Sequence, residues 1–261
     1  MKTEISGCDS PLAPVLVLSA GLGGTGNFWQ PQLAALTPYF RVVSYDHCGT
    51  GNNPAQLPEG YSLKAMAAEL IQALDERGID RFSLVGHALG GLIGLQIAAD
   101  FPQRLQSLVV VNGWLTLNAH TRRCFQVRQD LLLNTGVEAF VRAQPLFLYP
   151  ADWLAEHQQP VEAADAHHAA HFQGTDNLMR RLSALMATDF TLIAPQLQLP
   201  VLLMYSIDDL LVPWTCSLAL EAMLPQASTE AMARGGHAMS VTYSEEFNQR
   251  LLPWLQQHAI H

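Results

Sequence analysis

The first half of the chain alternates short apolar segments with longer segments that suit helices. Four continuous apolar segments, bounded by glycine, proline or polar residues, predict buried strands at residues 15–18, 41–46, 81–85 and 108–111. Residues 63–77 carry apolar positions at helical spacing before Gly78, and residues 88–100, closed by Pro102, predict a second helix. Strands that are apolar throughout and alternate with helices indicate a mostly parallel sheet covered by helices on both faces.

This alternation stops after the fourth strand. From residue 114 to residue 190 no strand is predicted, and the helical segments are 121–133, 137–144, 163–172 and 177–187. A strand pattern resumes at residues 201–205. We therefore expect a helical cap, residues 114–190, inserted into a core formed by residues 1–113 and 191–261. A last helix is expected near residues 245–257, where Pro253 should kink or split it.

Composition narrows the class of protein. With 261 residues, 49% apolar and only 14% charged, the chain can form one large folded domain and is not expected to be disordered. A net charge of −9 without any Lys/Arg run longer than two argues against nucleic acid as a partner. No apolar run approaches the roughly 18 residues of a membrane span. We expect a cytoplasmic protein that acts on a small molecule, and a homodimer is compatible with the sequence.

The cysteines give no sign of a disulfide framework or a zinc site. They are scattered and form no C-x-x-C pair, which is typical of free thiols in a reducing compartment. We accordingly expect neither a metal nor a cofactor. The four residues are Cys8, Cys48, Cys124 and Cys216.

The most informative motif lies where the strand at 81–85 meets the next helix. Residues 86–90 read Gly-His-Ala-Leu-Gly, which is the G-x-S-x-G nucleophile elbow of α/β hydrolases with Ala88 in place of serine. The flanking glycines permit the tight turn that lifts residue 88 above the sheet. The sequence thus predicts the elbow without its nucleophile.

Two further residues follow in the chain order of an α/β-hydrolase triad. Asp209 comes just after the strand at 201–205, and His237 stands in a Gly-Gly-His loop before the last helix. Asp209 is the favoured partner of His237, and the adjacent Asp208 is the alternative. Together, the three signals predict an α/β-hydrolase fold: a mostly parallel central sheet flanked by helices, with an inserted helical cap.

Two backbone amides are candidates for an oxyanion hole. The glycine-rich loop after the first predicted strand lies where this fold places its second donor, so we assign the N–H groups of Leu22 and Leu89. Both donors belong to the backbone and survive the loss of the serine side chain.

The same loop supports a competing interpretation. Gly21, Gly23 and Gly26 have the spacing of a dinucleotide-binding fingerprint, and Asp46 could be its ribose-binding acid. Pro31 indicates, however, that the next helix begins only near residue 30, too late for the fingerprint. An oxidoreductase would also leave the elbow, Asp209 and His237 unexplained.

Several segments of the chain resemble the RutD family, α/β-hydrolase-fold proteins of the Rut pathway of pyrimidine (uracil) degradation. The resemblance spans essentially the whole chain and includes alanine at the nucleophile position. One departure is Cys48, where most hydrolases of this superfamily carry arginine, so the charge balance near Asp46 is open. The segments that carry the resemblance are residues 46–54, 85–90, 111–115, 118–128 and 144–153.

The resemblance implies hydrolysis of 3-aminoacrylate or of carbamate, with release of ammonia. We expect direct attack by water, with His237 as general base and Asp209 holding its tautomer. One of Arg122, Arg123 and Arg128 in the cap could bind a small anion, or these residues could form a solvated helix face. His87 could contact substrate or pack beneath the elbow. The alternative from another class is a catalytically inactive hydrolase scaffold with a binding or regulatory role.

Overall fold

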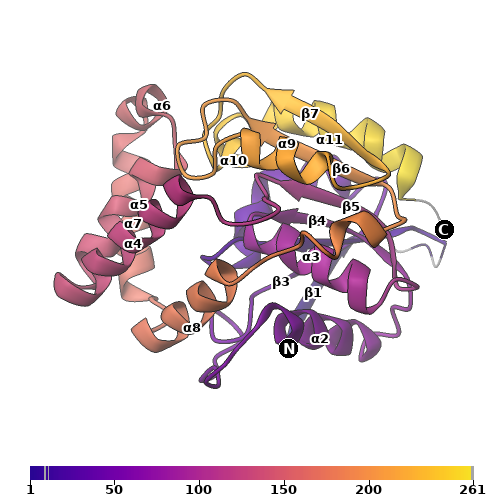
Figure 1. The fold of residues 1–261 in the computed structure, drawn as a ribbon, viewed down its shortest axis with the longest axis horizontal. Helices are drawn as coiled ribbons and strands as arrows, with labels where there is room; N and C mark the ends of the chain where they lie inside the picture. The colour runs from indigo at the N-terminus through magenta and orange to yellow at the C-terminus, as the bar shows by residue number, and fades with distance from the viewer. Residues whose placement is uncertain (9, 11, 260–261) are drawn as a thin grey trace.

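A seven-stranded sheet forms the centre of the molecule (Figure 1). The computed structural model describes residues 1–8, 10 and 12–259. In this part of the chain the strand order is β1-β3-β2-β4-β5-β6-β7, in which β1 is antiparallel to β3 and all other neighbours are parallel. The strands are β1 Thr3–Gly7, β2 Val15–Ser19, β3 Arg41–Tyr45, β4 Phe82–His87, β5 Leu105–Val111, β6 Val201–Ser206 and β7 Ala227–Met232.

Alternate residues of the central strands enter two different apolar cores, because successive side chains of a strand point to opposite faces. Val17 and Leu203 join the core under α2, α3 and α9, whereas Leu18 and Val109 join the core under α1 and α11. Both faces of the sheet are therefore buried. The helices of this core are η1 Gly26–Trp29, α1 Gln30–Leu36, α2 Leu63–Asp75, α3 Leu89–Asp100, η2 Ala194–Gln196, α9 Thr215–Glu221, α10 Met239–Thr242 and α11 Ser244–His258.

The five α-helices between β5 and β6 gather beside one end of the sheet (Figure 1). We call them the cap. A small apolar core of their own includes Phe140 and Leu178, and Leu22 of the glycine-rich loop packs against both this core and the main one. Leu22 therefore marks where the cap meets the sheet domain. The cap helices are α4 Ala119–Asn134, α5 Val137–Leu148, α6 Ala151–Glu156, α7 Gln158–Ala170 and α8 Thr175–Met186.

The strands and helices predicted from the hydrophobic pattern are confirmed to within a few residues at most ends. The segment expected to form a helix at 163–172 is longer towards its N-terminus and forms α7. Of the two outcomes expected at Pro253, the split does not occur, because α11 runs through this residue, and the kink stays a prediction. Pro253 lies on the exposed side of α11, so water can satisfy the carbonyl that loses its helical partner, while Phe247, Leu251 and Leu255 keep the buried face intact.

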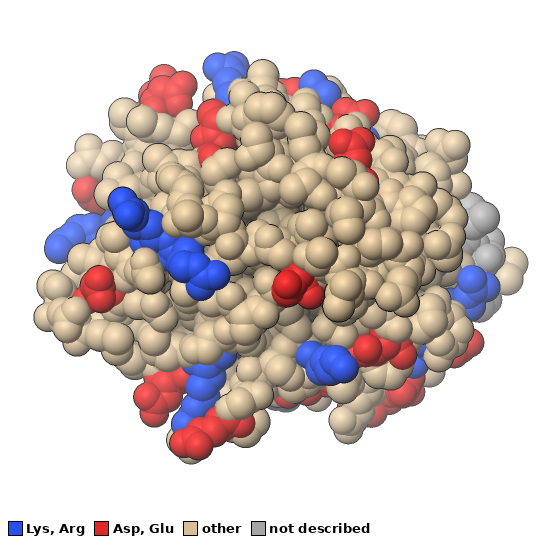
Figure 2. Space-filling view, in the orientation of Figure 1, with Lys and Arg blue, Asp and Glu red and all other residues tan. Residues whose placement is uncertain are grey.

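Charged side chains are sparse on the face of the molecule that Figure 2 shows. Figure 2 shows a face that is largely uncharged, with short groups of basic residues and separate acidic ones. Within the described residues, no helix is both long enough and apolar enough to cross a membrane.

Candidate functional site

The turn between β4 and α3 has the backbone geometry of a nucleophile elbow. Ala88 adopts φ 45° and ψ −109°, a combination that non-glycine residues rarely take. The turn requires glycine on both sides: a Cβ on Gly86 would lie 2.3 Å from the carbonyl carbon of Gly90, and one on Gly90 would lie 2.1 Å from the carbonyl oxygen of Ser19. The Ala88 amide donates to the Val111 carbonyl at 2.8 Å, which fixes the elbow to β5.

Asp209 and His237 form a buried pair. His237 Nδ1 donates to Asp209 Oδ2 at 2.7 Å, and both side chains are almost fully inaccessible. The other oxygen of Asp209 accepts the amides of Leu211 and Val212 at 2.8 and 2.9 Å, so the carboxylate is held in one orientation. Asp208, the alternative partner, instead accepts from Ser206 Oγ and the Gly235 and Gly236 amides. The structure therefore places Asp209 against His237 and uses Asp208 to shape the loop before it.

Asn112 is a positioning residue that the sequence did not reveal. It follows β5 with φ 51°, and its Nδ2 donates to the His237 carbonyl at 2.7 Å while its Oδ1 accepts the Ser206 amide at 3.1 Å. The side chain thus ties the ends of β5 and β6 to the His237 loop. The available signal was a polar residue directly after a buried apolar strand, at the edge where parallel sheets carry their sites.

His87 lies next to Ala88 and supports the same loop. Its Nε2 contacts the His237 carbonyl at 2.8 Å, and its ring lies 4.6 Å from both the Phe28 and the His237 ring centres. Burial is the largest cause that lowers the pKa of His87 to about 3, and the nearby His237 ring adds to the effect, so the His87 ring is neutral. This placement favours packing beneath the elbow, and a direct contact with substrate stays a prediction.

The two amides assigned to the oxyanion hole lie at the start of α3 and in the glycine-rich loop. Leu89 is the first residue of α3, whose first amides have no partner within the helix. Leu22 lies in the loop closed by the Gly24 amide and the Gly21 carbonyl at 3.0 Å. Neither Leu22 nor Leu89 donates its amide within the described part of the chain. Their role as oxyanion donors stays a prediction.

The structure removes the basis for a dinucleotide site at the glycine-rich loop. Gly26 begins the short η1, and α1 starts only at Gln30. The carboxylate of Asp46 accepts the amides of Gly26 and Asn52, both at 2.8 Å, so it holds its own loop together.

Arg181 of the cap places a positive charge next to Cys48. Arg181 of α8 is fully buried and donates through Nη2 to the Cys48 carbonyl. It also donates to Gln173 Oε1. A cationic side chain from another segment therefore lies beside the loop that lacks the superfamily's arginine.

The cap arginines have different surroundings. Of the three predicted counter-charges, Arg122 and Arg123 are exposed on α4, and their role in substrate binding stays a prediction. Arg128 on the same helix is buried. Among the described residues, no group of three or more His, Cys, Asp or Glu side chains is placed to hold a metal ion.

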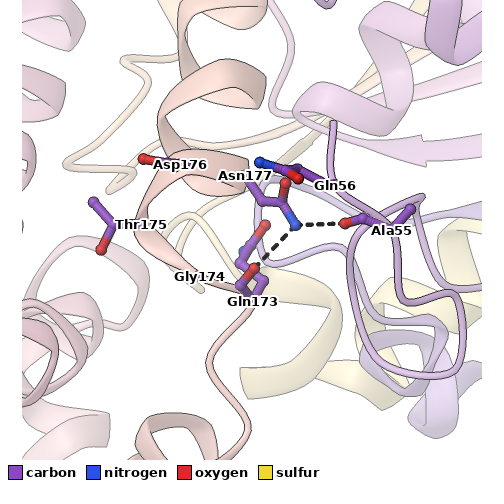
Figure 3. Close-up of a pocket in the computed structure, with 7 residues that line it drawn as sticks. All are labelled: Ala55, Gln56, Gln173, Gly174, Thr175, Asp176 and Asn177. Atoms are coloured by element: carbon purple, nitrogen blue, oxygen red, sulfur yellow. Dashed lines mark hydrogen bonds between the residues drawn. The ribbon is translucent and has the colours of Figure 1, made fainter. Parts of the chain in front are cut away.

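The structure also contains two cavities away from the catalytic pair. One, of about 220 Å³, lies between α5, α6 and α7. The other, of about 340 Å³, opens where the start of α8 meets the loop around Ala55 (Figure 3). Asn177 spans this junction, donating to the Ala55 carbonyl at 2.8 Å and accepting the Leu57 amide at 2.9 Å. This second hollow belongs to the attachment of the cap.

Comparison with known proteins identifies the family. A family model described as alpha/beta hydrolase fold matches residues 14–242. A protein of Serratia proteamaculans (strain 568) named "Putative carbamate hydrolase RutD" is 58% identical over 255 residues, covering 98% of this chain and 96% of the relative. A protein of the same name from Yersinia enterocolitica serotype O:8 / biotype 1B is 54% identical over 255 residues, covering 98% and 92%.

Solved structures show the same fold at lower sequence identity. The enol-lactonase from Burkholderia xenovorans LB400 superposes with a TM-score of 0.88 at 22% identity, over 98% of this chain and 96% of that chain. The chain therefore belongs to the α/β hydrolase fold family and, within it, to the group of hydrolases that carry the name RutD.

Proposed function

We propose that this protein hydrolyses carbamate or 3-aminoacrylate in pyrimidine (uracil) degradation and releases ammonia by direct attack of water. The observation that carries the proposal is the buried pair of His237 and Asp209, 2.7 Å apart, beside an elbow whose nucleophile position is Ala88. The name shared by the relatives supports carbamate, and the resemblance to the RutD family supports both substrates.

His237 is the general base in this mechanism. Its Nδ1 carries the proton that it donates to Asp209, because a carboxylate only accepts. The lone pair of the neutral ring is then on Nε2, which makes no hydrogen bond within the described residues. A water bound there can be deprotonated as it attacks.

With carbamate, the water oxygen bonds to the carbon while its proton moves to Nε2 of His237. The oxyanion that forms is stabilised by the amides of Leu22 and Leu89. The proton then passes from Nε2 to the nitrogen, the C–N bond breaks, and bicarbonate and ammonia leave. With 3-aminoacrylate, a proton from the water goes to the carbon next to the carboxylate and gives an iminium, and the hydroxide that remains adds to the other carbon. The hydroxyl proton of this adduct then passes through Nε2 of His237 to the nitrogen, the C–N bond breaks, and ammonia and malonic semialdehyde leave.

The missing serine restricts the protein to labile substrates. Triad enzymes that lose a catalytic member retain roughly 10³–10⁴-fold acceleration over water through binding and the oxyanion hole. Such a factor corresponds to roughly 4–5.5 kcal/mol of barrier, which is too little for a stable amide. Carbamate and 3-aminoacrylate decompose unaided in water, so the same factor is sufficient for them.

Ammonia release tests the proposal. Freshly generated carbamate or 3-aminoacrylate should release ammonia faster with the wild-type protein than in buffer, and His237→Ala should lower the enzymatic rate by about 100-fold or more, the usual contribution of a general base. His171→Ala, which changes an exposed cap histidine, is the matched control and should keep the wild-type rate. Wild-type and buffer rates that are equal for both substrates would support the binding or regulatory role instead.

A further inference from the structure

Arg128 is a buried cation without an acid partner. Its side chain is 5% exposed, and the rings of Phe125, Phe140 and Phe147 lie 5.3, 5.9 and 5.8 Å from its guanidinium carbon. Nη2 donates to Gln144 Oε1, whereas the inaccessible Nε finds no acceptor. No carboxylate pairs with this side chain in the described part of the chain. Burial lowers the pKa of Arg128 to about 10, which still leaves it charged at neutral pH.

The other buried arginine of the cap shows what a structural role looks like here. Arg181 donates from both terminal nitrogens to protein oxygens and lies within the field of the Glu69 carboxylate. Its Nε, like that of Arg128, has no acceptor, so the two arginines differ in their terminal nitrogens and in the nearby negative charge. Arg128 has one acceptor and no nearby negative side chain except the Cys124 thiol if it ionises. Packing against aromatic faces offsets part of the cost of burying a guanidinium, but it leaves the free donors unsatisfied.

One face of α4 places Arg128 on the side of the cap that faces the catalytic pair. His120, Cys124 and Arg128 are spaced by four residues and share this face. His120 Nε2 contacts the carbonyl of Leu210, the residue after Asp209, at 2.6 Å. Cys124 lies in the same apolar core as Ala88. Arg128 follows two turns beyond His120, about 12 Å along the helix.

The aromatic residues around Arg128 belong to or pack against the same apolar cores as Leu22 of the proposed oxyanion hole. Phe140, whose ring faces the guanidinium, belongs to the cap core, and Phe147 packs against the main core. Leu22, whose amide is a proposed oxyanion donor, packs against both cores. Arg128 therefore lies among side chains of the two cores that Leu22 also contacts, and its Nε is inaccessible there without an acceptor.

We propose that Arg128 is the substrate-binding residue that takes the carboxylate of a small monocarboxylate substrate. A planar guanidinium with unused N–H groups binds a carboxylate through two parallel hydrogen bonds, and an apolar surrounding strengthens that pairing. The carboxylate of the bound substrate would supply the negative charge that pairs with Arg128. The inference rests on the proposed function, because both candidate substrates are small carboxylates.

Equilibrium binding tests this assignment without requiring turnover. Acrylate and acrylamide have nearly the same shape and differ in charge, and neither is a substrate of the proposed reaction. Isothermal titration should show that the wild-type protein binds acrylate at least tenfold more tightly than acrylamide at neutral pH. Equal affinities, or no binding of acrylate, would overturn the role of Arg128 whether or not the protein releases ammonia from carbamate.

Variants separate a binding role from a structural one. Arg128→Met should abolish the preference for acrylate while keeping or raising the melting temperature, since removing an unpaired buried charge is often neutral or stabilising. Arg142→Met, an exposed change on α5, is the matched control and should keep the preference. Arg128→Lys keeps the positive charge but not the planar guanidinium, and it should retain a reduced preference for acrylate. It provides a second variant if Arg128→Met does not fold.

A preference for acrylate that survives in folded Arg128→Met or is lost in Arg122→Met would contradict the assignment. Failure of ammonia release together with a preference for acrylate that depends on Arg128 would instead reject the proposed reaction and leave the carboxylate site standing.

Discussion

Ala88 keeps the strained backbone of a nucleophile without the nucleophile. A non-glycine residue at φ 45° and ψ −109° costs of the order of 1–3 kcal/mol. The methyl group of alanine has no chemical role that would require this conformation. The turn does, however, place the Leu89 amide at the start of α3. The retained strain therefore agrees with a site that works through a backbone donor and the buried His237–Asp209 pair.

Restoring a hydroxyl at position 88 should restore covalent chemistry. In Ala88→Ser the new Oγ would lie on the elbow next to His87, whose ring is 4.6 Å from His237. We expect a fluorophosphonate probe to label this variant, and ester hydrolysis to rise about tenfold or more over the wild type. Mass spectrometry of the labelled peptide checks the site of modification.

Ala88→Gly is the control for the Ala88→Ser variant, because it changes the backbone strain without adding a hydroxyl. The wild type and this control should stay unlabelled. A folded Ala88→Ser protein that the probe leaves unmodified would show that position 88 is not aligned with His237.

At the scale of residues, the sequence identified the groups that occur in motifs. Asp209 and His237 were predicted because their order and their flanking residues are diagnostic of the fold. Asn112 was not assigned a role, and Arg128 could not be distinguished from Arg122 and Arg123 as a counter-charge, because both answers depend on contacts with segments far away in the chain. The hydrogen bond from Asn112 joins residues 125 positions apart, and the burial of Arg128 depends on the packing of α4 against α5.

At the scale of elements, α8 is attached to the core through the side chain of Asn177. This residue lies in the first turn of α8 and bonds to Ala55 and Leu57 of the loop that follows β3 (Figure 3). Arg180 adds a contact with the Leu57 carbonyl. Asn177 and Arg180, which lie one turn apart on α8, therefore provide hydrogen-bond partners for the backbone of a loop that contains no strand or helix.

Asn177→Ala should loosen this attachment. Loss of the acceptor for the Leu57 amide leaves a partly buried N–H without a partner, which should lower the free energy of unfolding by about 1 kcal/mol. Hydrogen exchange at Leu57 should become roughly tenfold faster. Gln56→Ala, a change of an exposed neighbour in the same hollow, should leave the exchange rate as in the wild type. Unchanged exchange in Asn177→Ala would show that other contacts hold the loop.

The elements that the sequence missed carry weak hydrophobic patterns. β1 and β7 lie at the two edges of the sheet, and most of their residues are exposed or half-buried, so neither forms the apolar run that predicts a buried strand. α6 spans only Ala151–Glu156, too short to show helical periodicity. Strands buried on both faces were predictable, whereas edge strands depend on a neighbouring strand that the local sequence does not specify.

At the scale of the whole molecule, two buried histidines link stability to pH. His47 lies two residues beyond the end of β3, and His87 is the last residue of β4. Burial is the largest cause that lowers the pKa of each histidine from 6.5 to about 3. For His47 the charge of Arg181 adds to the effect, and its Nε2 contacts the Ala20 carbonyl at 2.9 Å. Both rings are therefore neutral in the folded protein at pH values where the unfolded chain is already protonated.

Stability should therefore decrease as the pH falls from 6.5 towards 5. In this window the unfolded state binds protons that the folded state does not, so each buried histidine should lower the free energy of unfolding by up to about 1.4 kcal/mol per pH unit. Urea denaturation at several pH values measures the slope. His47→Gln, which can still donate to the Ala20 carbonyl, should remove about half of the contribution of the pair, whereas His171→Gln, exposed on α7's C-terminal flank, should leave the slope unchanged. The same slope in His47→Gln as in the wild type would mean that His47 takes up a proton in the folded protein. The carboxyl ends of the strands beside His47 would then be more accessible to water than their packing indicates.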